Sequence, residues 1–534
     1  MQKLFILRKG IRIMREWSEL GDCARLVNTA AVEPRDYQIN IARSVFTGRN
    51  TLVILPTGLG KTLIAVFAIA NAIASGKRAL ILAPTKPLSE QHHKSLEALL
   101  NIDKENILLL TGSVSAKQRR GLVKSAKVIA ATPQTISNDL KAGRMSLEDF
   151  GVVIFDECHK AAGRYAYTYI AEECSLNGVQ LIGLTASPGS KKEKVDALIK
   201  ALNIQNIEIR MSSDPDVERY VFGKEVTTIH VDKNMHIDTV LGQLKPVITE
   251  HLETLYKYGL SPFKDFERMP KGRLLQIGDN IKKLQAKNYK FMALFNYVYV
   301  LDLVHAYDLA ATEGLYPFVS YIESLRNREQ KSRVVLNILN NKNVVAAEWS
   351  ARQALEAGGE HPKMFKVIEM IGSRYTGKSV IIFAQYRSTI KKLVDVLNKN
   401  GISARAFVGK KEGVTNASQA QVIQDFRDNK FKVLVATSIG EEGLDIPSVD
   451  VVIFYEPVAS EIRNIQRKGR AGRIRYGEVM ILVTKGTKDE TYHMIAKMKE
   501  KKMHDLVLRI KKQLEYGNAG AGRNVLEDGQ RRLA

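Results

Sequence analysis

The sequence predicts an α/β protein with two parallel-sheet units separated by an all-helical unit. In both outer parts of the chain, short apolar strands rich in β-branched residues alternate with helical patterns. In the middle part this alternation stops, and apolar residues recur at helical spacing, beginning with Val240, Leu241 and Leu244. The chain then ends in a Gly-rich, basic stretch. The predicted divisions are 1–215, 216–361, 362–515 and a flexible basic tail at 516–534.

Composition narrows the class of protein. A length of 534 residues suits two to four domains, taking roughly 150 residues per domain. The formal net charge of +23 favours a polyanionic partner, most commonly nucleic acid. Thermophile surfaces add Glu as well as Lys, whereas the excess here is one-sided. The three cysteines are odd in number and far apart, which excludes a disulfide framework and a zinc pattern.

The first residues carry no recognisable targeting signal. Residues 4–7 are too short for the apolar core of a signal peptide, and Arg8 and Lys9 follow them directly. No apolar run approaches the ~20 residues of a membrane span. We therefore expect a cytoplasmic protein with no membrane partner.

The first predicted strand, 51–54, leads into a loop that suits a phosphate group. Its glycines let the backbone curl, so that consecutive N–H groups and the following helix N-terminus face one anion. Lys61 can then reach the outer phosphates of ATP, and the Thr62 hydroxyl can ligate Mg²⁺. The match to G-x-x-x-x-G-K-[ST] is incomplete, because Leu55 stands where the pattern has Gly. The predicted nucleotide-binding residues are Thr57, Gly58, Leu59, Gly60, Lys61 and Thr62.

Two residues upstream of this loop are candidates for binding adenine. The planar amide of Gln38 can hydrogen-bond both the donor and the acceptor edge of the base. Arg35 lies nearby in the sequence and can stack on it. We therefore assign Arg35 and Gln38 to the nucleotide.

The strand at 152–155 ends in two carboxylates. Asp156 can hold Mg²⁺ through its water shell, and Glu157 can orient and deprotonate the attacking water. Two adjacent carboxylates at the end of a buried strand are costly without a cation, which favours a catalytic role. The next strand ends in Thr185, and Ser187 follows. Their hydroxyls are candidates for coupling the two carboxylates to bound nucleic acid.

Three other strands of the first half, at 78–83, 106–110 and 127–130, each end in small polar, Pro or Gly residues. In open parallel sheets, ligands bind outside the carboxyl ends of the strands. Hydroxyl and backbone N–H groups there suit the phosphates of nucleic acid. The candidate contacts are Pro84, Thr85, Lys86, Thr111, Gly112, Thr132, Pro133 and Gln134.

The second sheet has no phosphate loop of its own, but it carries two arginines three residues apart, Arg470 and Arg473. Their fork-shaped cations suit the γ-phosphate. An arginine reaching the phosphates from an opposing domain is worth on the order of 10³–10⁵ in rate, and it makes hydrolysis depend on closure of the cleft. The predicted strands are 379–383, 404–408, 432–436, 450–455 and 478–483. The other candidates are Gln466 for catalysis, Gly443 and Asp445 for nucleotide, and Gln385, Arg387, Thr437 and Ser438 for nucleic acid.

The helical middle part carries many basic residues. Its second helical stretch, 289–311, is apolar nearly all round and is expected to be central to the unit. Basic runs are often only solvated faces, but a polyanionic partner favours nucleic-acid contact here. The basic residues are Lys257, Lys264, Arg268, Lys271, Arg273, Lys282, Lys283, Lys287 and Lys290, of which Lys282, Lys283 and Lys287 are the main candidates.

Taken in order, these motifs resemble the motif set of superfamily 2 helicases. The resemblance rests on 56–62, on Asp-Glu-Cys-His at 156–159, on Thr-Ala-Ser-Pro at 185–188 and on 466–473. Residues 440–447, followed by 451–457, look like the archaeal Hef and Fanconi anaemia M translocase family. That resemblance implies two RecA-like motor domains with a thumb-like helical insertion. It also implies an ATP- and Mg²⁺-dependent motor of 3′→5′ polarity that remodels stalled forks and Holliday-type junctions in DNA repair.

The same resemblance suggests a monomer in an archaeal or other prokaryote-like cytosol. Full-length Hef proteins often add a nuclease and a helix-hairpin-helix tail, and no nuclease motif occurs in these 534 residues. We therefore expect DNA as the main partner, with a sliding clamp or a separate nuclease as further candidates.

Two other functions stay open at this point. Double-stranded-RNA sensors also combine an Asp-Glu-Cys-His box with a helical insertion, and no motif here reveals a 2′-OH contact. A nucleic-acid scaffold with a decayed ATPase is disfavoured, because a decayed site would usually have lost at least one of its functional residues. All of them are present here: Lys61, Asp156, Glu157, Gln466, Arg470 and Arg473.

Overall fold

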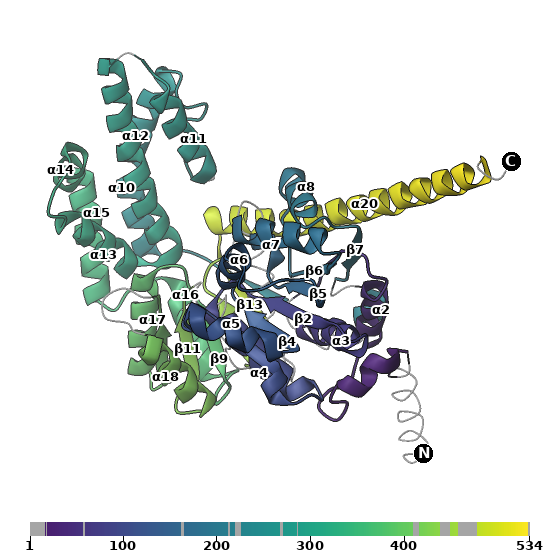
Figure 1. Ribbon diagram of the computed structural model, residues 1–534. Helices are drawn as coiled ribbons and strands as arrows, with labels where there is room; N and C mark the ends of the chain where they lie inside the picture. Colours follow the sequence, from purple (N-terminus) through teal and green to yellow (C-terminus); the bar gives the residue numbers. More distant parts are fainter. Residues whose placement is uncertain are drawn as a thin grey trace.

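The computed structural model contains two α/β units and a helical unit that projects from them (Figure 1). One helix, α20, runs past the first α/β unit towards the C-terminus. Within the described ranges, every helix is too short or too polar to cross a lipid bilayer. The structure describes residues 17, 19–56, 59–161, 165–211, 214–218, 220, 226–267, 271–285, 287–409, 416–437, 449–457 and 478–531.

The first α/β unit is built on a seven-stranded parallel sheet of order β3-β4-β2-β5-β6-β1-β7. Successive strand residues point to opposite faces, so Leu52 and Val53 enter two different apolar clusters. Helix α3 fills the cluster on one face, and α6 and α7 help to fill the other. The strands are β1 (Thr51–Ile54), β2 (Arg78–Leu82), β3 (Ile107–Leu110), β4 (Val128–Ala131), β5 (Phe150–Phe155), β6 (Gln180–Thr185) and β7 (Asn206–Ile209). The helices are α2 (Asp36–Val45), α3 (Lys61–Ala74), α4 (Lys86–Leu99), α5 (Ala116–Ser125), α6 (Pro133–Lys141), α7 (Tyr165–Leu176) and α8 (Lys192–Ala201).

The second α/β unit has a six-stranded parallel sheet of order β10-β11-β9-β12-β13-β8. Its edge strand β8 (Val226–Val231) pairs with β13 although it precedes the helical unit in sequence. This strand falls inside 216–361, the range for which the sequence predicts only helices. Its β-branched residues extend the sheet beside β13. The other strands are β9 (Val380–Phe383), β10 (Ala404–Phe407), β11 (Val433–Ala436), β12 (Val451–Phe454) and β13 (Glu478–Thr484), and the helices include α16 (Pro362–Gly372), α17 (Arg387–Lys399) and α18 (Asn416–Arg427).

The helical insertion packs around its own apolar core. The seven apolar residues from Val240 to Leu255 at helical spacing are all buried, as the sequence predicts. Helix α12 occupies the centre and packs against α10, α11, α13 and α14. The helices are α10 (Met235–Lys257), α11 (Lys271–Lys282), α12 (Lys287–Asp308), α13 (Leu315–Arg326), α14 (Arg333–Asn340) and α15 (Lys342–Glu356), with one π turn (Leu309–Glu313) after α12.

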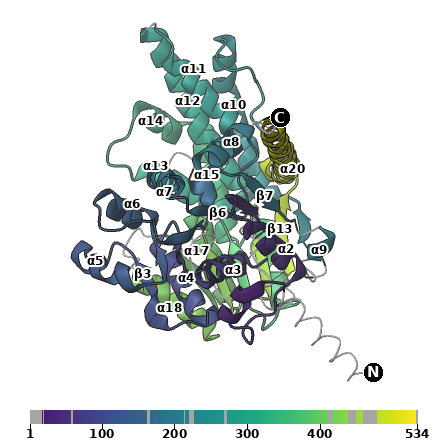
Figure 2. The same ribbon diagram turned by 45° about the vertical axis from the view of Figure 1, so that its right-hand side comes forward.

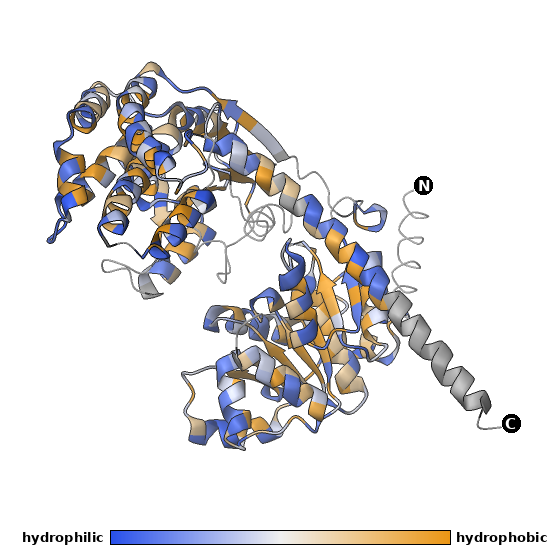
Figure 3. Cartoon of the chain, turned by 90° about the horizontal axis from the view of Figure 1, so that it is seen from above, coloured by the Kyte–Doolittle hydropathy of each residue, from blue (hydrophilic) through white to orange (hydrophobic). Residues whose placement is uncertain are grey.

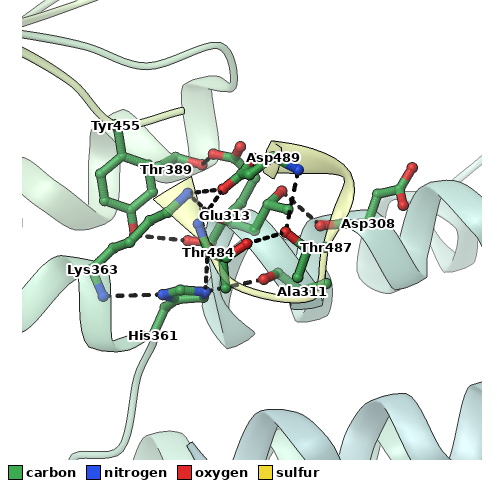
Figure 4. Close-up of polar contacts among 11 residues, drawn as sticks. Asp308, Ala311, Glu313, His361, Lys363, Thr389, Tyr455, Thr484, Thr487 and Asp489 are labelled. Carbon is green, nitrogen blue, oxygen red and sulfur yellow. Dashed lines mark hydrogen bonds and ion pairs between the residues drawn. The ribbon is translucent and has the colours of Figure 1, made fainter. Parts of the chain in front are cut away.

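A buried polar cluster joins the insertion to the second α/β unit (Figure 4). Lys363 of α16 is fully buried, pairs with Asp489 and donates to Thr312 O at 3.1 Å. Glu313 accepts a hydrogen bond from Thr389 Oγ1 at 2.9 Å. Burial, and then the charge of Asp489, raise the pKa of Glu313 to about 7, although Lys363 opposes the shift. Breaking such a buried network by one substitution is costly, so the two units are expected to move together.

Helix α20 (Lys488–Arg531) joins the second α/β unit to the first. It begins directly after β13, and its residues Met503, Val507 and Ile510 enter a core cluster of the first unit. Lys511 approaches Glu208 of β7 at 3.7 Å. Figures 2 and 3 show this helix from two further sides. It includes 516–531, most of the stretch for which the sequence predicts a flexible tail.

Candidate ATP site and nucleic-acid interface

The strand order divides the carboxyl edge of the first sheet into two halves. The phosphate loop follows β1, the Asp-Glu pair follows β5, and Thr185 ends β6; these three strands are neighbours. The candidate nucleic-acid contacts follow β2, β3 and β4, which form the adjoining half of the sheet. The fold therefore places the candidate nucleotide-binding residues beside the candidate nucleic-acid contacts on one edge, and we call these two groups the nucleotide half and the nucleic-acid half.

The phosphate loop turns into α3 at Gly60. This residue has φ of 81° and ψ of 39°, a left-handed conformation that suits glycine. Lys61 begins the helix, and its Nζ donates to Leu55 O across the loop at 3.1 Å. Thr62 lies in the first turn of α3. Thr57 and Gly58 lie outside the described residues.

Gln38 is packed against the phosphate loop. Its Oε1 accepts from Arg35 N at 3.0 Å, and its Nε2 donates to Leu59 O at 3.0 Å. Tyr37 OH donates to the same carbonyl at 2.7 Å. The Arg35 guanidinium lies over the Tyr220 ring, 5.7 Å from its centroid. Arg35 and Gln38 therefore sit beside the loop, and their contact with adenine stays a prediction.

Asp156 is a buried, ionised carboxylate. Its Oδ2 accepts from His92 Nε2 at 2.8 Å, and its backbone N–H donates to Leu82 O of β2 at 2.8 Å. Burial raises the pKa of Asp156, but the hydrogen bond and charge of His92, together with the charge of Lys61, outweigh burial and hold it below its usual range. An ionised oxygen ligand near the phosphate loop fits Mg²⁺.

Glu157 is linked to the Thr185–Ser187 turn through His159. His159 Nδ1 lies 3.3 Å from Glu157 Oε2 and 3.0 Å from Thr185 Oγ1. Thr185 Oγ1 donates to Ser187 O at 3.0 Å, and Ser187 Oγ donates to Met503 Sδ of α20 at 2.8 Å. Glu157 itself has φ of 50°, which costs a non-glycine residue energy and is common at functional sites. The turn therefore joins the second carboxylate to α20.

The nucleic-acid half presents both exposed and buried candidates. Four of them are exposed: Thr85, Lys86, Gly112 and Gln134. Two others, Thr111 and Pro133, are buried beneath the edge and do not present their side chains to solvent. Pro84 and Thr132 are half-buried. Exposed hydroxyl, amide and ammonium groups in this arrangement suit phosphate oxygens.

In the second α/β unit, three of the candidate residues can be placed. Gln385 is exposed after β9, Arg387 begins α17 and donates to Gly409 O at 2.6 Å, and Thr437 follows β11. The other candidates of this unit lie outside the described residues: Ser438, Gly443, Asp445, Gln466, Arg470 and Arg473.

Basic residues of the insertion are spread over three helices. Lys257 ends α10, Lys271, Arg273 and Lys282 lie on α11, and Lys287 and Lys290 lie on α12. Lys282 and Lys283 are exposed, and Lys282 pairs with Asp279 one turn earlier at 3.0 Å. Lys287 begins α12, and its side chain is outside the described part of the structure.

Sequence reasoning missed three residues of this site. His92, His159 and Met503 contact Asp156, Glu157 and Ser187 respectively. His159 belongs to the same short motif as the Asp-Glu pair, and its place in that motif is a signal that could have revealed it. His92 lies far from Asp156 in sequence, and no local pattern links the two.

Comparison with known proteins now defines the class. Residues 35–195 match the DEAD/DEAH box helicase family, and residues 362–475 match the helicase conserved C-terminal domain. The two α/β units are therefore the motor domains of an ATP-dependent helicase.

Solved and curated relatives define the family within that class. The Pyrococcus furiosus Hef helicase domain has 40% identity and a TM-score of 0.70, and the match covers 88% of this chain and 99% of that one. A Methanocaldococcus jannaschii protein, provisionally named an ATP-dependent RNA helicase, is 36% identical over 90% of this chain. The Neurospora crassa ATP-dependent DNA helicase mph1 is 31% identical over 86% of this chain. The chain spans 62% and 42% of the length of these two curated relatives. It belongs to the Hef and Fanconi anaemia M family of superfamily 2 helicases.

Proposed function

We propose that this chain is an ATP-dependent DNA helicase or translocase that acts on branched DNA in repair. Its substrates are stalled replication forks and Holliday-type junctions. The observation that carries the proposal is the shared sheet edge, where a nucleotide half adjoins a half suited to phosphates. The net charge of +23 and the relatives named as DNA helicases support it.

Within this function, the described residues have distinct roles. Lys61 binds the outer phosphates, Glu157 orients and deprotonates the attacking water, and Thr185 and Ser187 couple these events to the bound strand. Thr62 and Asp156 would hold Mg²⁺, which when bound neutralises phosphate charge. From the second motor domain, Gln466, Arg470 and Arg473 complete the site on closure.

The remaining assignments follow the family resemblance. We propose 3′→5′ polarity, a monomer, a cytosolic location, and a sliding clamp or a separate nuclease as further partners. The thumb-like insertion grips duplex near the branch through Lys282, Lys283 and Lys287.

Single-turnover ATP hydrolysis tests the substrate. Fork DNA should stimulate hydrolysis more than linear duplex DNA, and duplex RNA should stimulate it least. The RNA alternative has one specific observation in its favour, the name of the Methanocaldococcus jannaschii relative. Stronger stimulation by duplex RNA than by either DNA would establish that alternative instead.

The role of the insertion has its own test. Changing Lys282, Lys283 and Lys287 together to Glu should weaken fork binding and flatten its salt dependence, by about one in log–log slope for each phosphate that the variant no longer neutralises. Binding of a short single strand should change much less, because that strand runs across the motor domains. The same charge change at Lys366, Lys391 and Lys399 of α16 and α17 serves as a control. Equal losses on both substrates would make the insertion a general electrostatic patch.

A further inference from the structure

Helix α4 connects the two halves of the sheet edge. Its N-terminus follows Thr85, so Lys86, a candidate phosphate contact, is its first residue. His92 lies on the same helix, about 9 Å further along the axis at about 1.5 Å per residue. There His92 Nε2–H donates to Asp156 Oδ2 at 2.8 Å. A single rigid element therefore touches both the nucleic-acid half and the Mg²⁺ ligand.

The contact between His92 and Asp156 is buried and specific. The two side chains are only 8% and 11% exposed, so water competes weakly for their hydrogen bond. Asp156 directly follows β5, beside the end of β2, where Leu82 pairs with Phe155. The Asp156 backbone is held to Leu82 O at the same place. The backbone of Asp156 is thus held by β2, whereas its carboxylate is held by α4.

The start of α4 is tied to its loop. Ser89 is fully buried, and both its backbone N–H and its hydroxyl donate to Thr85 O, at 3.0 and 3.2 Å. A phosphate that displaces the loop at Thr85 therefore displaces the first turn of α4. Because a helix moves as a unit, His92 is displaced with it.

We propose that His92 is a positioning residue that ties the orientation of the Asp156 carboxylate to nucleic acid held at the start of α4. The proposal rests on the proposed function, since it requires nucleic acid at Thr85 and Lys86. It assigns to α4 a path for stimulation of hydrolysis that is separate from the Thr185–Ser187 turn on the other side of β5. His92 does not touch ATP; it acts only through Asp156.

The neighbouring histidine supplies a matched control. His93 lies on the same helix, but its Nε2 faces Ile107 O of β3 at 3.1 Å, away from Asp156. His92→Ala and His93→Ala remove the same group from adjacent positions. His92→Gln keeps a donor of similar reach to Asp156. In a Trp349→Phe background, fluorescence of the buried Trp17 checks that each variant folds.

The experiment measures ATP turnover of the full chain with and without fork DNA across a Mg²⁺ titration, together with fork affinity. His92→Ala should keep fork affinity and raise the Mg²⁺ concentration for half-maximal turnover. The ratio of fork-stimulated to DNA-independent turnover should fall about tenfold, the size expected for loss of one charge-assisted hydrogen bond. His92→Gln should recover most of that ratio, and His93→Ala should retain it.

Three outcomes would overturn the inference. An unchanged ratio in His92→Ala would show that α4 does not carry the stimulation. Equal defects in His92→Ala and His92→Gln, or in His93→Ala, would reduce His92 to packing. If no nucleic acid stimulates the unaltered protein, the proposed function fails as well, which separates that result from the other two.

Discussion

Two structural features determine how much replacing Gly60 with Ala should destabilise the first motor domain at its phosphate loop. The left-handed backbone at φ of 81° costs a non-glycine residue roughly 1–2 kcal/mol. A Cβ atom would also lie 2.3 Å from Gln38 Nε2, so that amide must leave Leu59 O. Losing this buried hydrogen bond adds about 1–3 kcal/mol. We therefore expect the substitution to lower the free energy of unfolding of the first motor domain by about 2–5 kcal/mol in total. We also expect it to weaken ATP binding.

Gly48→Ala separates the two contributions. Gly48 has nearly the same φ, 80°, and a Cβ atom there would meet nothing within 4 Å. It should therefore cost only the backbone part, about 1–2 kcal/mol. Gln38→Ala added to Gly60→Ala should relieve the contact, so the two substitutions should be less than additive.

The assay uses one of the two tryptophans of the chain. Trp17 is buried, and its ring lies edge-on to Phe67 of α3, the helix that follows the phosphate loop, with 6.1 Å between the ring centroids. In a Trp349→Phe background, urea unfolding followed by Trp17 fluorescence reports on this core. Equal losses of stability for Gly60→Ala and Gly48→Ala would refute the contact between position 60 and Gln38.

Three further predictions concern the buried cluster and the ATP site. Lys363→Met leaves Asp489 without its buried cation and should cost about 3–5 kcal/mol in urea unfolding. Lys485→Met breaks an exposed pair with Asp232 and should cost about 1 kcal/mol or less. Similar costs for the two variants would contradict the difference in burial. Glu313, with its pKa raised from 4.5 to about 7, keeps a proton in the folded state that the unfolded chain releases. Stability should therefore fall as pH rises across that interval, and Glu313→Gln should lose this dependence; an unaltered slope would assign it to another group. Glu157→Gln should bind ATP and Mg²⁺ without turnover, because only the base is removed; loss of nucleotide binding would reassign Glu157 as a metal ligand.

Patterns within short stretches of sequence predicted the strands that those stretches form. The strands that lead into Leu55, Asp156 and Gln385 were predicted because apolar, β-branched runs ended by polar residues carry their own signal. The edge strand β8 was missed because its partner β13 lies on the other side of the insertion. Pairing across such a distance leaves no mark in a short window.

Several residues were missed for the same reason, because their partners lie far away in the sequence. Met503, Val507 and Ile510 show helical spacing, which signals a helix but not the surface that it covers. Lysine is a residue type that usually lies at the surface, and only the fold buries Lys363 against Asp489. His92 likewise became part of the ATP site only once β2 and β5 were seen to be neighbours.

Helix α20 acts as a strut between the motor domains. Its first turn is fixed by Asp489, which pairs with Lys363, and by Lys488, whose Nζ donates to Asp308 at 2.8 Å. Met503 is already inside the core of the first motor domain, about 21 Å along the helix. An unbroken helix resists stretching, so we expect these two anchor points to keep a constant separation. We expect any change in the angle between the motor domains to be a rotation about this helix, and the insertion, which is held to the second motor domain at Thr312, to turn with that domain.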